Sequence, residues 1–328
     1  MKISEMINRK VSRSNRIVIK EAYKRGVEFE SLPKKRFKMT YKNKSYLIRK
    51  GSIFWTYNTR LANRVTDMKE VTSRLLRTKG YPAPENTVFS MNDVERAWKW
   101  AEPILPIVLK PYNGTMGKLV FVNIDNYEEF KSCFEKISEK HNEVLIEKFQ
   151  PGKEYRFTFV KNEIVGIAHR IPANVTGDGV KTVKQLIKEK NQERKLRKNP
   201  IHKQIKLDEE SERVLHRKGY SFSYVPVKNE VIYLRENSNV STGGDAIDVT
   251  NEISDEIKEH VRKAMLSING LRVCGIDVLI NDDKINILEI NTKPMLTIHH
   301  YPWKGSVHNV AGKVVDAMFP ETIKNESK

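Results

Sequence analysis

Apolar positions in the first 150 residues switch repeatedly between the spacing of a helix and the alternation of a strand. Residues 14–26 (SNRIVIKEAYKRG) have helical spacing, and Gly26 is a suitable residue to end that helix. Residues 37–55 are rich in Tyr, Ile and Phe and predict a hairpin that turns around Lys42–Lys44. Further helices are expected over residues 66–80, 90–104 and 126–140, and short strands over 106–110 and 143–149.

The second half of the chain is richer in alternating segments. Residues 153–171 alternate on both sides of a Lys–Asn–Glu turn and predict a hairpin. Residues 176–236 are highly charged and predict a mostly helical insertion that ends in a strand. The remaining expected elements are a helix over residues 252–268, a pair of strands over 274–291 and a last helix over 306–318.

Helices and strands alternate early in the chain, whereas antiparallel hairpins dominate later. This order predicts an α/β (α+β) fold in which α/β units lead into a mainly antiparallel sheet. The 328 residues suffice for two or three compact units. We therefore divide the chain into a small N-terminal α/β unit over residues 1–62, a second unit over 63–145, and a third over 146–328 that carries the insertion.

The expected strand pair in CGIDVLINDDKINILEINTKP carries acidic and amide side chains among its apolar ones. Glu289 and Asn291 are two residues apart, so they point to the same side of their strand. Asp277 on the preceding strand lies opposite or diagonal to Glu289, depending on the register. Two neighbouring carboxylates need a proton or a cation between them, and hard oxygen ligands suit Mg²⁺ or Mn²⁺. The alternative is the exposed polar side of a half-buried hairpin.

Lys110 closes the apolar strand PIVLK, and a loop with two glycines, NGTMGK (113–118), follows it closely. If Mg²⁺ is bound, a nucleoside triphosphate is its usual companion. The lysine, together with backbone N–H groups left accessible by Gly114 and Gly117, could then bind phosphate. The loop lacks Walker A spacing, so an ordinary turn is the alternative.

The segment LIEKFQPGKEYR places Glu147 at the end of a buried strand and Glu154 after a proline–glycine turn. A free strand edge beside Glu147 could hydrogen-bond adenine, and the carboxylate of Glu154 could bind the two ribose hydroxyls. Ordinary charges on a surface loop are the alternative.

The chain is strongly basic, with a formal net charge of +18 and a pI of about 9.6. Such a balance is typical either of a protein with a polyanionic partner or of one with a lysine-rich surface. The basic residues are scattered and do not form one tract interleaved with aromatic residues, so nucleic acid is not the expected partner. The densest stretch, residues 188–206, indicates a solvated helix and loop.

The two cysteines, Cys133 and Cys274, cannot form a disulfide framework. The first residues contain no apolar segment of the kind found in signal peptides, and no apolar run has membrane-spanning length. We therefore expect a cytoplasmic protein that does not enter a membrane. The sequence leaves a homo-oligomer open.

Taken in order, the segments TDMKEVTSRLLRTKGYPAPE, VLKP, NGTMGK, EKFQPGKE, GIDVL and LEINT resemble the ATP-grasp superfamily. Two longer segments, RIPANVTGDGVKTVKQLI and YLRENSNVSTGGDAIDVT, are similar to the branch that includes cyanophycin synthetase and the bifunctional glutathione synthetases. The resemblance covers about residues 12–320. It implies the ATP-grasp fold, with two α+β lobes, here residues 63–145 and 146–328, that grip ATP.

The resemblance also implies a role for each motif. Two lysines would contact phosphates under a mobile loop, the end of one strand would hold adenine and ribose, and the later strand pair would hold the metal. The implied nucleotide-binding residues are Lys69, Lys110, Gly114, Thr115, Met116, Gly117, Glu147, Lys148 and Phe149 (the last two through their backbone) and Glu154, and the implied metal ligands are Asp277, Glu289 and Asn291.

The reaction implied by the resemblance is an ATP-dependent carboxylate–amine ligation. The substrate carboxylate attacks the γ-phosphate, and an amine then displaces phosphate from the acylphosphate to give an amide or peptide bond. A free-standing enzyme acting on an amino acid or peptide is expected, and the basic balance favours an acidic carboxylate donor. The alternative is a nucleotide-holding protein that recognises a polyanion without ligating anything.

Candidates for direct catalysis are fewer. Related D-alanine ligases tend to carry an arginine two residues before the first metal aspartate, where this chain has Gly275. Arg235 is the candidate for stabilising the acylphosphate, with Asn237 nearby, and Arg170 is the candidate for binding a substrate carboxylate. A plain ion pair is the alternative for both arginines.

The loop TIHHYPWKG (297–305) follows the second metal strand and is expected to border the acceptor site. His299 and His300 could orient substrate or act as a base, and Trp303 could stack on substrate. The alternative is that the histidines have no catalytic task and that Trp303 anchors the loop.

Overall fold

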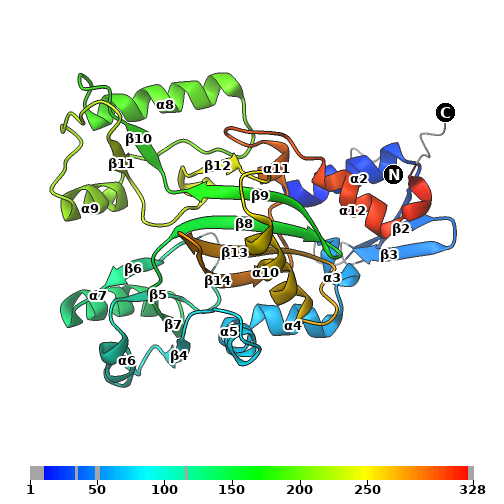
Figure 1. The fold of residues 1–328 in the computed structure, drawn as a ribbon, viewed down its shortest axis with the longest axis horizontal. Coiled ribbons are helices and arrows are strands. Elements are labelled where there is room, and N and C mark those ends of the chain that lie inside the picture. Colours follow the sequence, from blue (N-terminus) through cyan, green and yellow to red (C-terminus); the bar gives the residue numbers. More distant parts are fainter. Residues whose placement is uncertain (1–10, 34–35, 49–51, 115–116, 324–328) are drawn as a thin grey trace.

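The computed structural model describes residues 11–33, 36–48, 52–114 and 117–323. In this part of the chain the strands form four sheets, and helices pack against them (Figure 1). Every strand pairing within the four sheets is antiparallel. The predicted α+β fold with a mainly antiparallel sheet is confirmed.

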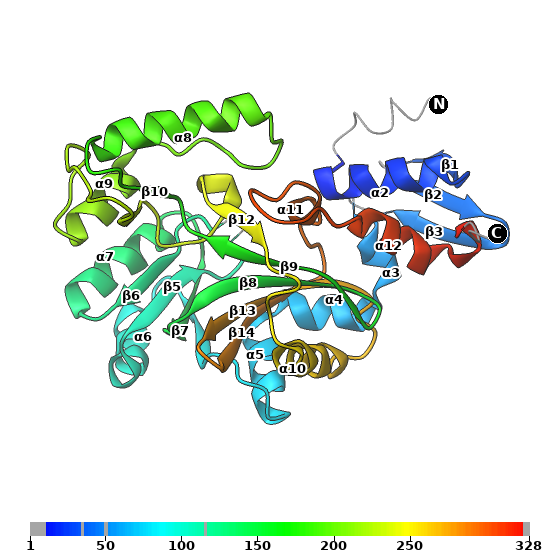
Figure 2. The ribbon, with the colours of Figure 1, turned by 45° about the horizontal axis from the view of Figure 1, so that its top comes forward.

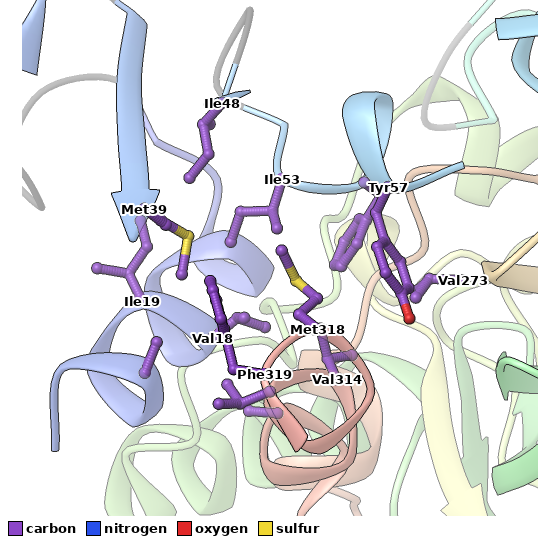
Figure 3. Packing of buried hydrophobic residues seen from close by; sticks show 14 of the residues in the cluster. Val18, Ile19, Met39, Ile48, Ile53, Tyr57, Val273, Val314, Met318 and Phe319 are labelled. Atoms are coloured by element: carbon purple, nitrogen blue, oxygen red, sulfur yellow. The ribbon is translucent and has the colours of Figure 1, made fainter. Parts of the chain in front are cut away.

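The N-terminal unit is a three-stranded sheet packed against two helices from opposite ends of the chain. Its elements are α2 (Arg13–Lys24), β1 (Glu28–Leu32), β2 (Arg36–Tyr41), β3 (Lys44–Ile48), α3 (Phe54–Tyr57), and, from the end of the chain, α12 (Val310–Met318) followed by the 3-10 helix η3 (Pro320–Thr322). Val18 of α2, Met39 of β2 and Met318 of α12 meet in one buried core (Figure 3). The predicted hairpin between β2 and β3 is therefore held by residues almost 300 positions away.

The helix expected over residues 66–80 is present as α5 (Lys69–Thr78), but it begins later than expected, and a helix that was not predicted, α4 (Arg60–Asp67), precedes it. Met68 separates them with extended backbone angles (φ −101°, ψ 95°). The break makes Lys69 the first residue of α5.

A four-stranded sheet follows, in the order β4-β7-β5-β6. Its strands and helices are β4 (Asn86–Ser90), α6 (Val94–Ala101), the 3-10 helix η1 (Glu102–Ile104), β5 (Ile107–Pro111), β6 (Phe121–Ile124), α7 (Tyr127–Ser138) and β7 (Glu143–Lys148). Phe130 and Phe134 of α7 pack on Ile107 and Leu109 of β5. The helices therefore cover the side of this sheet on which the side chains of Ile107 and Leu109 lie.

The largest sheet has five strands in the order β12-β9-β8-β13-β14. Its strands are β8 (Lys153–Val160), β9 (Glu163–Ile171), β12 (Asp245–Asp248), β13 (Val273–Asn281) and β14 (Lys284–Asn291). The helices α4, α5 and α10 (Asp255–Leu266) cover one face, where Phe157 and Phe159 of β8 are buried. Because side chains alternate along a strand, Arg156 and Thr158 point to the other face.

Residues 176–236, expected to be mostly helical, contain two helices of 15 and 9 residues and a good deal of irregular chain. The elements of this insertion are β10 (Asn174–Thr176), α8 (Val183–Arg197), α9 (Glu209–Arg217) and β11 (Val231–Tyr233), and η2 (Val240–Thr242) and α11 (Thr297–His300) lie beside it. In Figures 1 and 2 the insertion lies on the side of β8 and β9 opposite to α4 and α10. It therefore stands over the polar face of the five-stranded sheet.

Candidate active site

A cavity of about 980 Å³ lies between the four-stranded sheet, the polar face of the five-stranded sheet and the insertion. Of the predicted site residues, Thr115 and Met116 lie outside the described part of the chain. All the others line this one cavity: Lys69, Lys110, Gly114, Gly117, Glu147, Lys148, Phe149, Glu154, Arg170, Arg235, Asn237, Asp277, Glu289 and Asn291. Segments more than 200 residues apart in sequence are thus brought to one place.

The register of β13 and β14 places Asp277 directly opposite Glu289. A bulge at this point shifts the pairing, so that Val278 pairs with Ile287. Because the bulge adds one residue to β14, Ile287 and Ile290 both reach the core while Glu289 lies on the cavity side. The sequence alone could not fix this register, and the bulge is what keeps the oxygen ligands and the core residues on opposite faces.

Both oxygens of the Asp277 carboxylate are bound by arginines. Arg156 on the neighbouring strand β8 donates to both oxygens from Nε and Nη2, and its Nη2–Oδ2 distance is 2.8 Å. Arg170 of β9 donates to Oδ2 at 3.1 Å. Burial raises the pKa of the Asp277 carboxyl, but the two guanidinium groups outweigh it and hold this pKa well below its usual range. Asp277 is therefore ionised at neutral pH.

Arg156 was not among the predicted site residues, although the sequence contains a signal for it. In KEYRFTFV the apolar residues Tyr155 and Phe157 alternate with Glu154 and Arg156, which puts both charged side chains on one face of a buried strand. Arg156 is only 7% exposed. A buried arginine in such a pattern needs an acidic partner, and Asp277 is that partner.

The residues present fit a hard divalent cation in part. No described residue donates a hydrogen bond to the Glu289 carboxylate or forms an ion pair with it, and Asn291 Oδ1 accepts a hydrogen bond only from its near neighbour Lys293 N, at 2.8 Å. Carboxylate and amide oxygens suit Mg²⁺, and the described residues contain no cluster of three His, Cys, Asp or Glu side chains. The oxygens of Glu289 and Asn291 are thus accessible to a cation, whereas Asp277 already shares its oxygens with two arginines.

Two lysines lie on the other side of the cavity. Lys110 Nζ is 2.7 Å from Glu147 Oε1, and both residues are held on adjacent strands, β5 and β7. Burial lowers the pKa of Lys110, but Glu147, Glu289 and Glu154 raise it by more, so the ammonium group stays charged. Among the described residues, Lys69 Nζ contacts the backbone oxygen of Tyr112, at 3.5 Å. Lys69 and Lys110 therefore both present ammonium groups to the cavity.

The predicted adenine contacts are only partly compatible with the structure. The backbone N–H groups of Lys148 and Phe149 already donate to Glu85 O and Pro106 O, each at 2.9 Å. A contact from these N–H groups to adenine would break a hydrogen bond within the protein. Glu147 is buried beside them, at 5% exposure.

Glu154, the predicted ribose ligand, is held from two sides. Arg170 lies opposite it on β9, with Nη1 2.9 Å from Glu154 Oε1. The hydroxyl of Ser238, a residue not predicted, donates to the other carboxylate oxygen. Arg170 thus bridges Glu154 and Asp277, so its predicted contact with a substrate carboxylate would compete with these two ion pairs.

The glycine loop contacts the segment that follows β11. Asn237 Nδ2 donates to Gly117 O at 3.3 Å. Gly117 has a positive φ of +67°, and a Cβ there would lie 2.7 Å from Asn239 Nδ2. The positive φ favours glycine at this position, and a larger residue would also displace the side chain of Asn239.

Arg235 is engaged by the insertion itself. Its Nη2 lies 2.7 Å from both carboxylate oxygens of Asp208, the residue that caps α9, and its Nη1 donates to Ser211 Oγ at 2.6 Å. The ion-pair alternative for Arg235 is thus realised, although the residue also lines the cavity.

The histidines of the loop after β14 lie outside the cavity lining. His299 is 1% exposed, with Nε2 2.7 Å from Thr158 Oγ1, and burial lowers its pKa to about 3. His300 Nε2 accepts the N–H of Ala311 at 3.0 Å. Trp303 is buried, and the guanidinium carbon of Arg197 lies 4.2 Å from the centre of its indole ring. All three side chains thus make contacts within the protein, and Trp303 anchors the loop.

Comparison with known proteins agrees with this geometry. Residues 171–297 match the family described as an ATP-grasp domain. The chain is 32% identical, over 94% of its length, to the cyanophycin synthetase of Nostoc sp., and 33% identical, over 93%, to the glutathione biosynthesis bifunctional protein GshAB of Clostridium perfringens. The crystal structure of a bifunctional glutathione synthetase from Pasteurella multocida superposes with a TM-score of 0.65 at 26% identity, and covers 97% of this chain and 44% of that one.

The chain therefore contains an ATP-grasp domain and has the ATP-grasp fold, and the resemblance to the ATP-grasp superfamily is confirmed. It spans 35% of the length of the cyanophycin synthetase and 41% of the length of GshAB. No helix in the described ranges is long and apolar enough to cross a membrane.

Proposed function

We propose that this protein is an ATP-dependent carboxylate–amine ligase that forms an amide or peptide bond on an amino acid or peptide through an acylphosphate. One observation carries the proposal. A single cavity brings the ammonium groups of Lys69 and Lys110 together with the oxygen ligands Glu289 and Asn291. Opposed groups of this kind suit a triphosphate and its divalent cation.

The chain's own residues divide the task of holding ATP. Lys69 and Lys110 contact the phosphates, and the segment from Glu147 to Phe149 lies against adenine. Glu154 binds the ribose hydroxyls, and it is already oriented for this by Ser238 and Arg170. Positioning the γ-phosphate toward the substrate carboxylate converts a bimolecular step into an effectively unimolecular one.

Glu289 and Asn291 would hold Mg²⁺, or Mn²⁺ in its place, and Asp277 would join them only by sharing its oxygens with the arginines. The cation would neutralise charge on the phosphate oxygens. Arg156 and Arg170 do not depend on it, because their guanidinium groups are fixed by Asp277. Together with Asp277 and Glu154 they form a charge-balanced cluster in the floor of the cavity, next to Glu289 and Asn291.

The ligation balances without a covalent intermediate on the enzyme. A carboxylate oxygen of the donor attacks the γ-phosphorus, and the bond from that phosphorus to ADP breaks. The amine of the acceptor then attacks the acyl carbon, phosphate leaves, and the amine loses one proton. No nucleophilic Ser, Cys or His is needed, which agrees with His299 being buried outside the cavity.

The charge of the cavity favours an acidic donor. Its described lining residues include seven lysines and three arginines against five carboxylates. A triphosphate with its cation neutralises only part of this excess of positive charge, and the remaining charge attracts a substrate with further carboxylates.

The cysteines bear on localisation. Cys133 and Cys274 are both free and buried, which is in keeping with a reducing compartment, the cytoplasm.

The test is release of ADP from MgATP with a panel of carboxylic acids and amines. A ligase releases ADP over many turnovers only when both a donor and an amine are present, because the amine must discharge the acylphosphate, and with hydroxylamine as the amine it yields the hydroxamate of the donor. The net charge of +18 supports a second candidate, a nucleotide-holding protein that recognises a polyanion. That protein would bind ATP and a polyanion, and its affinity for the polyanion would fall as the salt concentration is raised. It would release no ADP with any pair of carboxylic acid and amine.

A further inference from the structure

A second pocket, of about 340 Å³, lies against the first turn of α2. Lys293 and Met295, which follow β14, line both this pocket and the large cavity. The two spaces are therefore neighbours on either side of one short segment. None of the described residues that line the smaller pocket is acidic, and two of them, Arg13 and Lys293, are cationic.

Buried hydroxyl groups in this pocket lack partners. Ser52 is 5% exposed and Thr297 is 1% exposed, and neither side-chain oxygen has a hydrogen-bond partner among the residues that the structure describes. Ser14 Oγ accepts the N–H of Leu296 at 2.9 Å, which leaves its own proton to donate. A buried hydroxyl without a partner costs free energy, and an acceptor bound in the pocket would remove that cost.

The N-terminus of α2 supplies further donors. Ser12 caps the helix by accepting the N–H of Asn15 at 3.3 Å. No described residue accepts from the backbone N–H groups of Arg13 and Ser14, and the dipole of this 12-residue helix favours negative charge at the same end. The Arg13 side chain also donates to Pro200 O, which fixes it beside the pocket.

We propose that this pocket binds the carboxylate of the amino acid or peptide that supplies the amine. The inference rests on the proposed ligase function. Its described lining offers hydroxyl and N–H donors and positive charge but no carboxylate, so it fits an anion, and its volume of about 340 Å³ accommodates an amino acid. A carboxylate held here leaves the amine of the same molecule free to reach past Met295 toward the large cavity.

The test is a binding measurement without ATP, so that it does not depend on turnover. The protein is titrated by calorimetry with the twenty amino acids, with their carboxamides, and with inorganic phosphate. We expect at least one free amino acid to bind and its carboxamide, which lacks the negative charge, to bind at least tenfold more weakly. Binding of phosphate alone, equal binding of the carboxamide, or no binding of any amino acid would each overturn the proposal.

Variants place the binding in this pocket. Ser52→Ala and Thr297→Val should each weaken the amino acid roughly tenfold or more, as expected for one hydrogen bond to a charged group. Neither should lower the melting temperature, because these hydroxyls have no partner to lose. Thr78→Val, at an exposed position on α5, is the matched control and should bind normally.

Unchanged binding in both pocket variants would overturn the assignment. Failure of this proposal and failure of the proposed function are distinguishable. If an amino acid binds as described but no donor and amine pair releases ADP, the carboxylate site stands and the ligase does not. If ADP is released but neither Ser52→Ala nor Thr297→Val changes binding of the amine substrate, the ligase stands and this site does not.

Discussion

The guanidinium group of Arg156 on β8 and the carboxylate of Asp277 on β13 face each other directly across two neighbouring strands and form a two-point ion pair. Gly275 makes room for it, since a Cβ there would lie 2.8 Å from Arg156 Cδ. The side chain of Arg156 therefore lies against the backbone of Gly275 on the adjacent strand.

Removing Arg156 should destabilise the protein strongly. Arg156→Met leaves the buried Asp277 carboxylate with Arg170 alone, and breaking a buried pair in this way costs about 3–5 kcal/mol. The free energy of unfolding, measured with urea, should fall by that amount. In the double variant with Asp277→Asn the loss should be smaller than the sum of the two single losses. Additive losses would show that the two side chains do not interact.

Glu289→Gln should abolish turnover while leaving the fold intact. The change keeps the size of the side chain but removes the charge that would hold the cation, and ADP release should fall at least about a hundredfold. Asp283→Asn is a matched control on the exposed turn of the same hairpin and should retain full activity. A Glu289→Gln variant with near-normal turnover would contradict the metal role.

Glu154→Ala should weaken ATP by roughly 1–3 kcal/mol, the range for losing a charged hydrogen-bonding partner. The structure adds a second effect, because Arg170 then keeps only Asp277 as its ion-pair partner. Calorimetric titration of a non-hydrolysable ATP analogue measures the change. Glu163→Ala, exposed at the far end of the same hairpin, should bind normally. Equal affinity in Glu154→Ala and wild type would mean that the ribose contact is misassigned.

His299 should make stability depend on pH. In the unfolded chain a histidine binds its proton near pH 6.5, whereas burial lowers the pKa of His299 to about 3 in the folded protein. The contribution of neutral His299 to the free energy of unfolding is fully present above pH 6.5. It is lost as the pH falls from 6.5 toward 3, by up to about 1.4 kcal/mol per pH unit. His169 and His202, whose pKa values are lowered to about 4, act in the same direction.

The measurement is urea unfolding of wild type and His299→Gln at pH 7, 6 and 5. The variant should lose less stability between pH 6 and pH 5 than wild type, because one buried histidine has been removed. His216→Gln, at an exposed position, should keep the dependence of the wild type. An identical slope in His299→Gln and wild type would show that His299 is not held neutral by the fold.

Local patterns predicted the hairpins and most helices because spacing and alternation are properties of neighbouring residues. The β2–β3 hairpin and the β13–β14 pair are where the alternation places them. The break at Met68 could not be seen, because it separates two helices that both have helical spacing. The insertion was predicted as too helical, because charged residues with good helix propensity also occur in its irregular segments.

Site residues on strands could be predicted from the acids and lysines that interrupt apolar runs. What the sequence could not give was the partner of each charge. Arg235 pairs with Asp208 and Arg156 with Asp277, and both partners come from other elements. The same limit applies to His299, whose place beneath Thr158 depends on a sheet formed by distant segments.

The most direct test of the account is binding of a non-hydrolysable ATP analogue with and without Mg²⁺, in variants from both sides of the cavity. Wild type should bind one analogue per chain, and more tightly with Mg²⁺. Lys69→Met and Glu289→Gln should each weaken it at least about tenfold, and only Glu289→Gln should abolish the effect of Mg²⁺. Wild-type affinity in both variants, or no effect of Mg²⁺ on the wild type, would contradict a shared nucleotide and metal site in this cavity.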